Sequence, residues 1–305
     1  MSPLLQAVPR PRYDRSVVVV EPPAGGPGAW AGAPGALLVD GVYYLAYRMR
    51  RPIGMGRGIS NVLARSTDGV QFEQIAVVNR DSFGAESLQR PAITLTPEGR
   101  WRLYVSCATP NSKHWWVSML EADAPEKLGD AEPRTVLPGD ETVGIKDPVL
   151  LHEGDLWHLW ASAHPLESDE NADRMSTWYA TSPDGVDWTW RGSMLNPRPG
   201  TWDARGTRLT SVLPVADGLL ASYDGRASAA ENWEERTGTA RGERNADGLF
   251  GPLTADEAGP TGSPYAPGGL RYLTVLALPD GGYRLYFEAT REDGAHELRT
   301  ELVEG

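Results

Sequence analysis

The chain of 305 residues has one cysteine, Cys107, and no long apolar run. A single cysteine excludes a disulfide within the chain and fits a reducing compartment, so we expect a cytoplasmic protein. The stretch from Met1 to Arg15 contains arginines and prolines but no apolar centre, which argues against a secretory signal peptide. The valines at 17–20 form a run too short to cross a membrane, so no membrane partner is expected.

Several functional motifs are also missing. There is no glycine-rich phosphate loop, no zinc-type spacing of cysteine and histidine, and no Gly-x-Ser-x-Gly motif. The five histidines are too scattered for a transition-metal site, so we expect no cofactor, although one histidine could hold an ion or a water in a central channel. The formal charge of −12 leaves no basic face for phosphates and argues against nucleic-acid binding.

Glycine, proline and aromatic residues are abundant, with 34 Gly, 25 Pro, 11 Trp and 11 Tyr, a composition that favours many turns and few long helices. Five aromatic and β-branched segments start 56 to 64 residues apart. Each follows an apolar segment and a turn of the Asp-Gly or Glu-Gly type, which joins antiparallel strands tightly. The five segments are Tyr43–Arg48, Trp101–Thr109, Trp157–Pro165, Leu219–Arg226 and Tyr283–Thr290. The apolar segments before them are Ala36–Val39, Ala92–Leu95, Val149–Leu151, Leu209–Pro214 and Tyr272–Leu278.

This repeat predicts an all-β protein, a five-bladed β-propeller with four antiparallel strands per blade, in one domain over residues 1–305. The segment Ser16–Glu21 is predicted to be an outer strand that closes the ring by joining the last blade. A two-sheet sandwich is the alternative, but it would not repeat the same order of strand, turn and aromatic strand five times. A helical turn is expected only near Ala124–Leu128.

The propeller topology predicts where the functional site lies. The turns between first and second strands are short, whereas the connections on the opposite face are long and polar. Function is usually carried by variable loops on a rigid scaffold, so we expect the site on that face, over the central channel. In the third repeat, Asp147 precedes an apolar strand and His164 ends its partner strand, so the two should share this surface.

Charged and aromatic residues at these strand ends are the candidate site residues. Three carboxylates, Asp147, Glu86 and Asp224, are candidates for catalysis. Carboxylates and indoles together fit a sugar, because carboxylates accept hydrogen bonds from hydroxyls and flat rings pack on indoles. The candidates for substrate binding are Arg90, Lys113, His114, Trp115, His164, Asp203, Arg208, Arg226, Arg271 and Glu288.

Structural roles compete with these assignments. Asp224 and Arg226 could form a salt bridge within a turn, and Glu86 could pair with Arg90 across a loop. We expect His158 and Cys107 to be core residues and the segment Glu231–Arg236 to be mostly a solvated strand or rim.

A five-bladed propeller in which a blade starts Lys146-Asp147-Pro148-Val149 resembles the arabinanase, levansucrase and invertase-type glycoside hydrolases and the related β-mannoside phosphorylases. The resemblance implies an aspartate base or nucleophile in the first blade, a glutamate acid and a further aspartate that orients the sugar. Asp147 matches the Asp-Pro pattern. The first blade instead begins Gly32-Ala33-Pro34-Gly35, and the second has Gln89-Arg90-Pro91, so the set of carboxylates is incomplete.

The resemblance implies acid/base glycosyl transfer from a glycoside or sugar-like metabolite to water or phosphate, with Asp147 central. A non-catalytic binding protein and a biosynthetic enzyme with other chemistry are the alternatives, since a fold does not determine a function. Arginine grips carboxylate or phosphate with two hydrogen bonds, so the many arginines predict an anionic partner; ion pairs between blades are the competing explanation. The sugar, the linkage and the oligomeric state are left open.

Overall fold

The computed structural model describes residues 8–52, 54–168 and 170–305, and its regular structure is almost entirely β. The described helices are four short 3₁₀ segments: η1 (Tyr13–Arg15), η2 (Arg80–Phe83), η3 (Pro125–Asp130) and η4 (Ala229–Glu231). Segment η3 contains most of the helical turn predicted near Ala124–Leu128. Among the described residues, no helix is long and apolar enough to cross a membrane.

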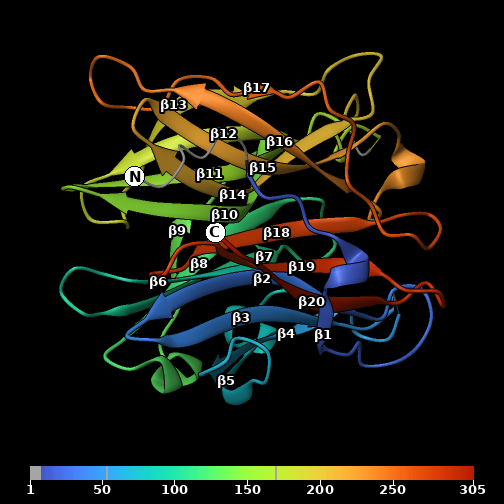
Figure 1. Ribbon diagram of the computed structural model, residues 1–305, viewed down its shortest axis with the longest axis horizontal. Coiled ribbons are helices and arrows are strands. Elements are labelled where there is room, and N and C mark those ends of the chain that lie inside the picture. Colours follow the sequence, from blue (N-terminus) through green and yellow to red (C-terminus); the bar gives the residue numbers. More distant parts are fainter. Residues whose placement is uncertain (1–7, 53, 169) are drawn as a thin grey trace.

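Antiparallel pairing groups the strands into units of four (Figure 1). Unit 1 contains β2 (Trp30–Val39), β3 (Val42–Arg50), β4 (Gly58–Ser66) and β5 (Glu73–Asn79). Unit 2 contains β6 (Ser87–Leu95), β7 (Trp101–Ala108), β8 (Trp115–Ala122) and β9 (Arg134–Leu137). Unit 3 contains β10 (Val143–Glu153), β11 (Leu156–Pro165), β12 (Ser176–Ser182) and β13 (Thr189–Leu195). Unit 4 contains β14 (Gly206–Val215), β15 (Gly218–Arg226), β16 (Arg236–Glu243) and β17 (Thr254–Ala255).

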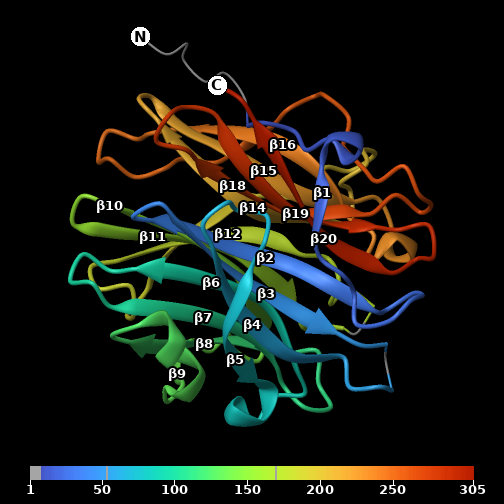
Figure 2. The same ribbon diagram turned by 60° about the horizontal axis from the view of Figure 1, so that its bottom comes forward.

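Unit 5 draws on both ends of the chain. It consists of β18 (Leu270–Ala277), β19 (Tyr283–Thr290), β20 (His296–Val303) and the N-terminal strand β1 (Val17–Val20). Strand β1 runs antiparallel to β20, with Val17 opposite Thr300 and Val18 opposite Arg299. Figures 1 and 2 show the blue β1 beside the red β20. The predicted pairing of the segment after Ser16 with the last unit is thus observed.

The units pack side by side through their first strands. Strand β2 contacts β6, β6 contacts β10, β10 contacts β14, β14 contacts β18, and β18 contacts β2. Single parallel bridges, one between Arg236 and Leu270 and one between Trp30 and His296, also join units 4, 5 and 1 into one twelve-stranded sheet. Every neighbouring pair of units therefore shares an interface.

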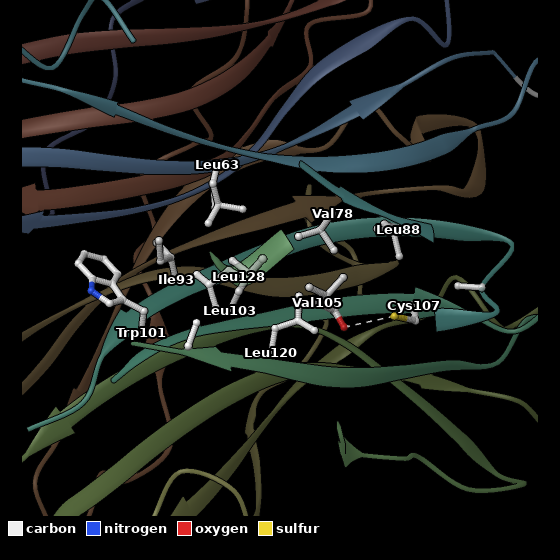
Figure 3. Packing of buried hydrophobic residues seen from close by; sticks show 13 residues of the cluster. Leu63, Val78, Leu88, Ile93, Trp101, Leu103, Val105, Cys107, Leu120 and Leu128 are labelled. Carbon is white, nitrogen blue, oxygen red and sulfur yellow. Dashed lines mark hydrogen bonds between the residues drawn. The ribbon is translucent and has the colours of Figure 1, made fainter. Parts of the chain in front are cut away.

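The hydrophobic core is divided among these interfaces. One cluster joins Leu63 of unit 1 to Leu88 and Leu103 of unit 2 (Figure 3), and four others fill the remaining contacts between units. Cys107 lies in this first cluster, where burial raises the pKa of its thiol. It is a core residue, as the sequence predicted.

The first strands are longer than the apolar segments that predicted them. Strand β10 starts at Val143, six residues before the predicted Val149. A β-bulge between Lys146 and Val149 interrupts its pairing with β11, and the strand continues on both sides of the bulge. Strands β2 and β18 have bulges at the corresponding place. Residues in these bulges, such as Asp147 with φ of 55°, have left-handed backbone conformations. A bulge re-aims side chains, and here it separates the N-terminal half of each strand, which contains Trp30, Lys146 or Arg271, from a mainly apolar C-terminal half.

Candidate functional site

A pocket of about 390 Å³ lies among the N-terminal halves of the first strands and the C-terminal ends of second strands. Its lining is strongly cationic although the chain is acidic. The positively charged residues are Arg48, Arg50, Arg57, Lys113, Lys146, Arg205, Arg208, Arg226 and Arg271, and the carboxylates are Glu170, Asp173 and Glu235. Trp30, Trp115, Trp233 and Tyr272 supply aromatic surface.

Ion pairs form the floor of the pocket. Arg208 binds Asp224 at 2.6 Å and Asp147 at 3.4 Å, and its guanidinium carbon lies 3.8 Å from the ring centroid of Tyr272. Arg271 binds Glu235 at 2.6 Å and Glu288 at 2.7 Å. These side chains are all at most 2% exposed, so each charge depends on its partners for solvation.

The first strand of unit 1 makes room for one of these carboxylates. A Cβ atom on Gly32 would collide with the Glu288 carboxylate, which also binds Arg48 at 2.9 Å. The sequence lacks a carboxylate at the start of this strand. The structure places Glu288, from β19, against that point instead, and glycine is required because the carboxylate approaches the backbone so closely.

Two predicted catalytic carboxylates lie behind the floor. Asp147 and Asp224 are fully buried and do not line the pocket. Burial raises the pKa of Asp224 above its ordinary value, although Arg208 opposes the change. Burial acts in the same direction on Asp147, but Lys146 and Arg208 outweigh it, so its pKa lies below the ordinary value. Both carboxylates hold Arg208 in place.

Glu86, the third predicted catalytic carboxylate, lies at the surface. It binds Arg57 at 2.8 Å and accepts a hydrogen bond from the backbone N–H of Asn111. The alternative that Glu86 pairs with Arg90 is wrong. Arg90 is buried and donates to the carbonyl oxygens of Pro34 and Thr210.

The other predicted residues divide between the pocket and its surroundings. Those that line it are Lys113, Trp115, His164, Arg208, Arg226 and Arg271. Asp203 is buried beside the pocket, bound to Arg198 and Tyr223. His114 is hydrogen-bonded to Thr109 and faces a separate surface hollow. Arg90 and Glu288 are buried outside the lining.

The segment Glu231–Arg236 of unit 4 is mostly partly or fully exposed, as predicted, but it contains one buried carboxylate. Glu235 is 2% exposed and binds both Arg226 and Arg271. Burial alone would raise its pKa, but Arg271, Arg208 and Arg226 hold the pKa well below the ordinary value. The alternative of an Asp224–Arg226 salt bridge is also not observed, because each residue has other partners.

Arg50, which was not among the predicted site residues, is the most unusual side chain of the pocket. It is 2% exposed, and no carboxylate of the described residues lies within 4.0 Å of it. Its guanidinium carbon lies 4.1 Å from the ring centroid of Trp30 and 5.1 Å from that of Trp233. Burial and the neighbouring Arg48, Arg57 and Arg271 lower its pKa to about 9.

The signal for Arg50 was present in the sequence. Alternate residues of a strand share a face, so the Arg48 and Arg50 side chains leave β3 on the same side. The predicted strand ended at Arg48, which assigned Arg50 to a loop. Trp233 and Glu235 were not predicted for another reason: the segment between β15 and β16 has no periodicity that distinguishes the residues facing the pocket from the others.

Among the described residues, no group of three or more His, Cys, Asp or Glu side chains could hold a metal ion. Most charged side chains of the pocket are instead guanidinium or ammonium donors, which bind anions rather than cations.

No protein-family model and no curated protein matches this chain. Solved structures do match it. A thermostable family-43 glycoside hydrolase aligns over 92% of this chain and 90% of its own, with a TM-score of 0.69 at 14% identity. The GH43_1 enzyme from Xanthomonas citri, solved with xylotriose, aligns over 94% of this chain and 89% of its own, with a TM-score of 0.67 at 14% identity.

The chain has the propeller-like fold of these glycoside hydrolases. A structure from the GH130 family of mannoside phosphorylases, which contains glycoside hydrolases that target β-1,2 mannosidic linkages in Candida mannan, shares this fold at a TM-score of 0.61. It is 15% identical, and the match covers 88% of this chain and 83% of that one. The predicted resemblance in fold is therefore confirmed. The roles of individual residues have to be argued from this chain's own geometry.

Proposed function

We propose that this protein binds and converts a glycoside or sugar-like metabolite that carries an acidic group, in the pocket at the end of the first strands. The observation that carries the proposal is Arg50, a buried arginine without a carboxylate partner among the described residues. A buried cation that lacks a partner is costly, and a bound anion would supply the missing charge. A neutral sugar would not.

The surroundings of Arg50 fit a carboxylate attached to a ring. A guanidinium offers parallel N–H donors that match the two oxygens of a carboxylate. Trp30 and Trp233 flank the guanidinium, and the exposed ring of Trp233 offers flat apolar surface, on which a sugar ring packs. Trp233 is 39% exposed and marks the open side of this corner.

We also propose that the five units are the blades of a five-bladed propeller formed by one domain. The cyclic contacts between first strands and the sharing of β1 with unit 5 support this arrangement. A cytoplasmic location is part of the same proposal, supported by the single, buried cysteine.

Acid/base glycosyl transfer to water or phosphate through Asp147, Glu86 and Asp224 stays a prediction. The geometry favours positioning roles for these residues, because each holds an arginine and none lines the pocket. A binding protein without catalysis is the second candidate. It is favoured by Glu235, the buried carboxylate of the lining, whose interactions with guanidiniums leave it poorly suited to transfer protons.

Calorimetric titration with D-galacturonate and D-galactose tests the acidic-ligand proposal. We expect galacturonate to bind more tightly than galactose, since only galacturonate has a carboxylate for Arg50. Arg50→Gln should weaken galacturonate binding by about tenfold or more, the loss typical of a charge-assisted hydrogen bond.

The matched control is Arg241→Gln, because Arg241 is exposed and pairs with Asp256 away from the pocket. Thermal unfolding of both variants checks that they are folded. Equal binding of the two sugars by the unaltered protein, or an Arg50→Gln variant that binds galacturonate as well as the unaltered protein does, would contradict the proposal.

A further inference from the structure

Lys146 is a second cation of the pocket that lacks close partners. Its side chain is 12% exposed and lines the pocket, and its ammonium makes no hydrogen bond with the described residues. The nitrogen lies 4.6 Å from the ring centroid of Trp115. The nearest carboxylate oxygen belongs to Asp147, at 3.8 Å, and that oxygen also interacts with Arg208.

These surroundings disfavour the charged form of the amine. Burial lowers the pKa of Lys146 to about 8. Asp147 and Glu235 oppose the change, whereas Arg208 and Arg226 reinforce it. The amine can therefore both release and accept a proton near neutral pH.

His164 lies on the same part of the pocket and has a defined tautomer. Its Nδ1 is 2.8 Å from the carbonyl oxygen of Ala172. A carbonyl only accepts, so Nδ1 carries the hydrogen and Nε2 has a free lone pair. Nε2 is buried and has no partner among the described residues. Burial, together with Lys146, holds the pKa of His164 well below its ordinary value, so the ring is neutral.

The carboxylates of the pocket do not offer the same chemistry. Glu235 is held by Arg226 and Arg271, and Asp173 is held by Arg205 at 2.7 Å. Glu170 lies at the exposed rim. The amine of Lys146, by contrast, faces the pocket, makes no hydrogen bond with the described residues and lies no closer than 3.8 Å to a carboxylate oxygen.

We infer that Lys146 is the proton-transfer residue of this pocket and that the neutral Nε2 of His164 is the fixed acceptor beside it. This inference rests on the proposed function, because it gives the acidic sugar a catalytic partner at the Lys146 side of the pocket. In the transfer, the ammonium of Lys146 donates a proton to the leaving oxygen of the sugar while the bond between that oxygen and carbon breaks. The electron pair of the broken C–O bond goes to the leaving oxygen, the N–H pair stays on nitrogen, and Lys146 becomes a neutral amine. The amine then takes a proton from the attacking water, whose oxygen forms the new bond to carbon.

The chain suits a direct measurement, because it has three lysines: Lys113, Lys127 and Lys146. Incorporation of ¹³C-labelled lysine gives three side-chain signals, and Lys146→Met and Lys127→Met assign two of them. We expect the Lys146 signal to titrate well below that of Lys127, an exposed lysine that pairs with Asp123. A Lys146 signal that titrates no lower than the Lys127 signal would overturn the inference.

Proton uptake on ligand binding is the second measurement. A bound anion stabilises the ammonium, so D-galacturonate binding at pH 8 should take up a fraction of a proton, measured by calorimetry in buffers of different ionisation enthalpy. Lys146→Arg keeps the charge but cannot titrate, so it should bind without that uptake, whereas Lys127→Met should retain it. The same uptake in Lys146→Arg as in the unaltered protein would also overturn the inference.

The two proposals fail in different ways. If the unaltered protein does not bind D-galacturonate, the acidic-ligand proposal is wrong, and the titration of the Lys146 signal still decides the present inference. If galacturonate binds without proton uptake that depends on Lys146, the acidic-ligand proposal stands and Lys146 is not the proton carrier.

Discussion

Lys146 and Arg50 show how single side chains are held in an unfavourable state at this site. Each is buried, each lies against an indole ring, and each has a pKa below its ordinary value. Groups of this kind are concentrated at functional sites, because a ligand supplies the interaction that the folded chain does not. The residues that hold them, such as Asp147, act through their neighbours.

The same burial predicts an effect on stability. The pKa of Lys146 falls from an ordinary 10.5 to about 8 on folding, so between these pH values the unfolded chain binds more protons than the folded chain. The free energy of unfolding therefore rises with pH through this window, and the full cost of the buried charge is present below pH 8. Lys146→Met should raise the free energy of unfolding at pH 7 by about 1–3 kcal/mol, measured by urea denaturation.

Lys127→Met is the control, because its exposed ion pair contributes little, and we expect a change within about 0.5 kcal/mol. A less stable Lys146→Met variant would mean that the ammonium stabilises the folded chain, contrary to the burial argument.

At the scale of elements, two turns with the same sequence pattern dock adjoining units. Ser66 and Asp68 bind the backbone of the β4–β5 turn, and Ser182 and Asp184 do the same in the β12–β13 turn. A tyrosine of a neighbouring unit donates its hydroxyl to each turn, with Tyr286 bound to Gly69 at 2.9 Å and Tyr104 bound to Gly185 at 2.7 Å. The turns therefore fix both a hairpin and an interface.

Strand β1 is the element on which unit 5 depends, because without it β20 would be an exposed edge. Val18→Pro removes a backbone donor from β1 and should lower the free energy of unfolding by about 1–3 kcal/mol, measured by chemical denaturation. Val17 is half exposed, so Val17→Thr in the same strand should change it by less than about 0.5 kcal/mol. If Val18→Pro were as stable as the unaltered protein, β1 would not be a structural part of unit 5.

The whole molecule combines an acidic surface with a cationic pocket whose floor is neutralised by buried carboxylates. Interactions with arginines hold the pKa values of Glu235 and Glu288 below the ordinary 4.5, although burial opposes this. A lowered carboxylate pKa contributes stability that is present above the ordinary value and is lost as pH falls toward the folded value. The raised pKa of Asp224 changes the free energy of unfolding in the opposite direction as the pH falls. It is outweighed by the lowered pKa values of Asp147, Glu235 and Glu288.

We therefore expect the free energy of unfolding to fall steadily below about pH 4.5, as measured by urea denaturation between pH 7 and 3. Glu288→Gln should weaken this dependence, since it removes one of the lowered carboxylates. Stability that does not change over this range would contradict the network of buried ion pairs.

The strand order and the joining of β1 to the last unit followed from the sequence alone. Alternating apolar residues, acidic-glycine turns and a repeat of about 60 residues are local features, and local features determine which segments become antiparallel hairpins. The sequence also predicted the face of the molecule on which the second strands end. Six residues predicted to lie together on that face do line one pocket: Lys113, Trp115, His164, Arg208, Arg226 and Arg271.

Only the tertiary structure decided which charges face the pocket and which lie behind it. Asp147 and Arg50 both stand near strand ends in the sequence, yet Asp147 is turned behind Arg208 by a bulge while Arg50 projects between two indoles. Pairing depends on distances between residues far apart in the chain, such as Arg48 with Glu288. A sequence pattern carries no information on those distances, because they are set by how the five units pack against one another.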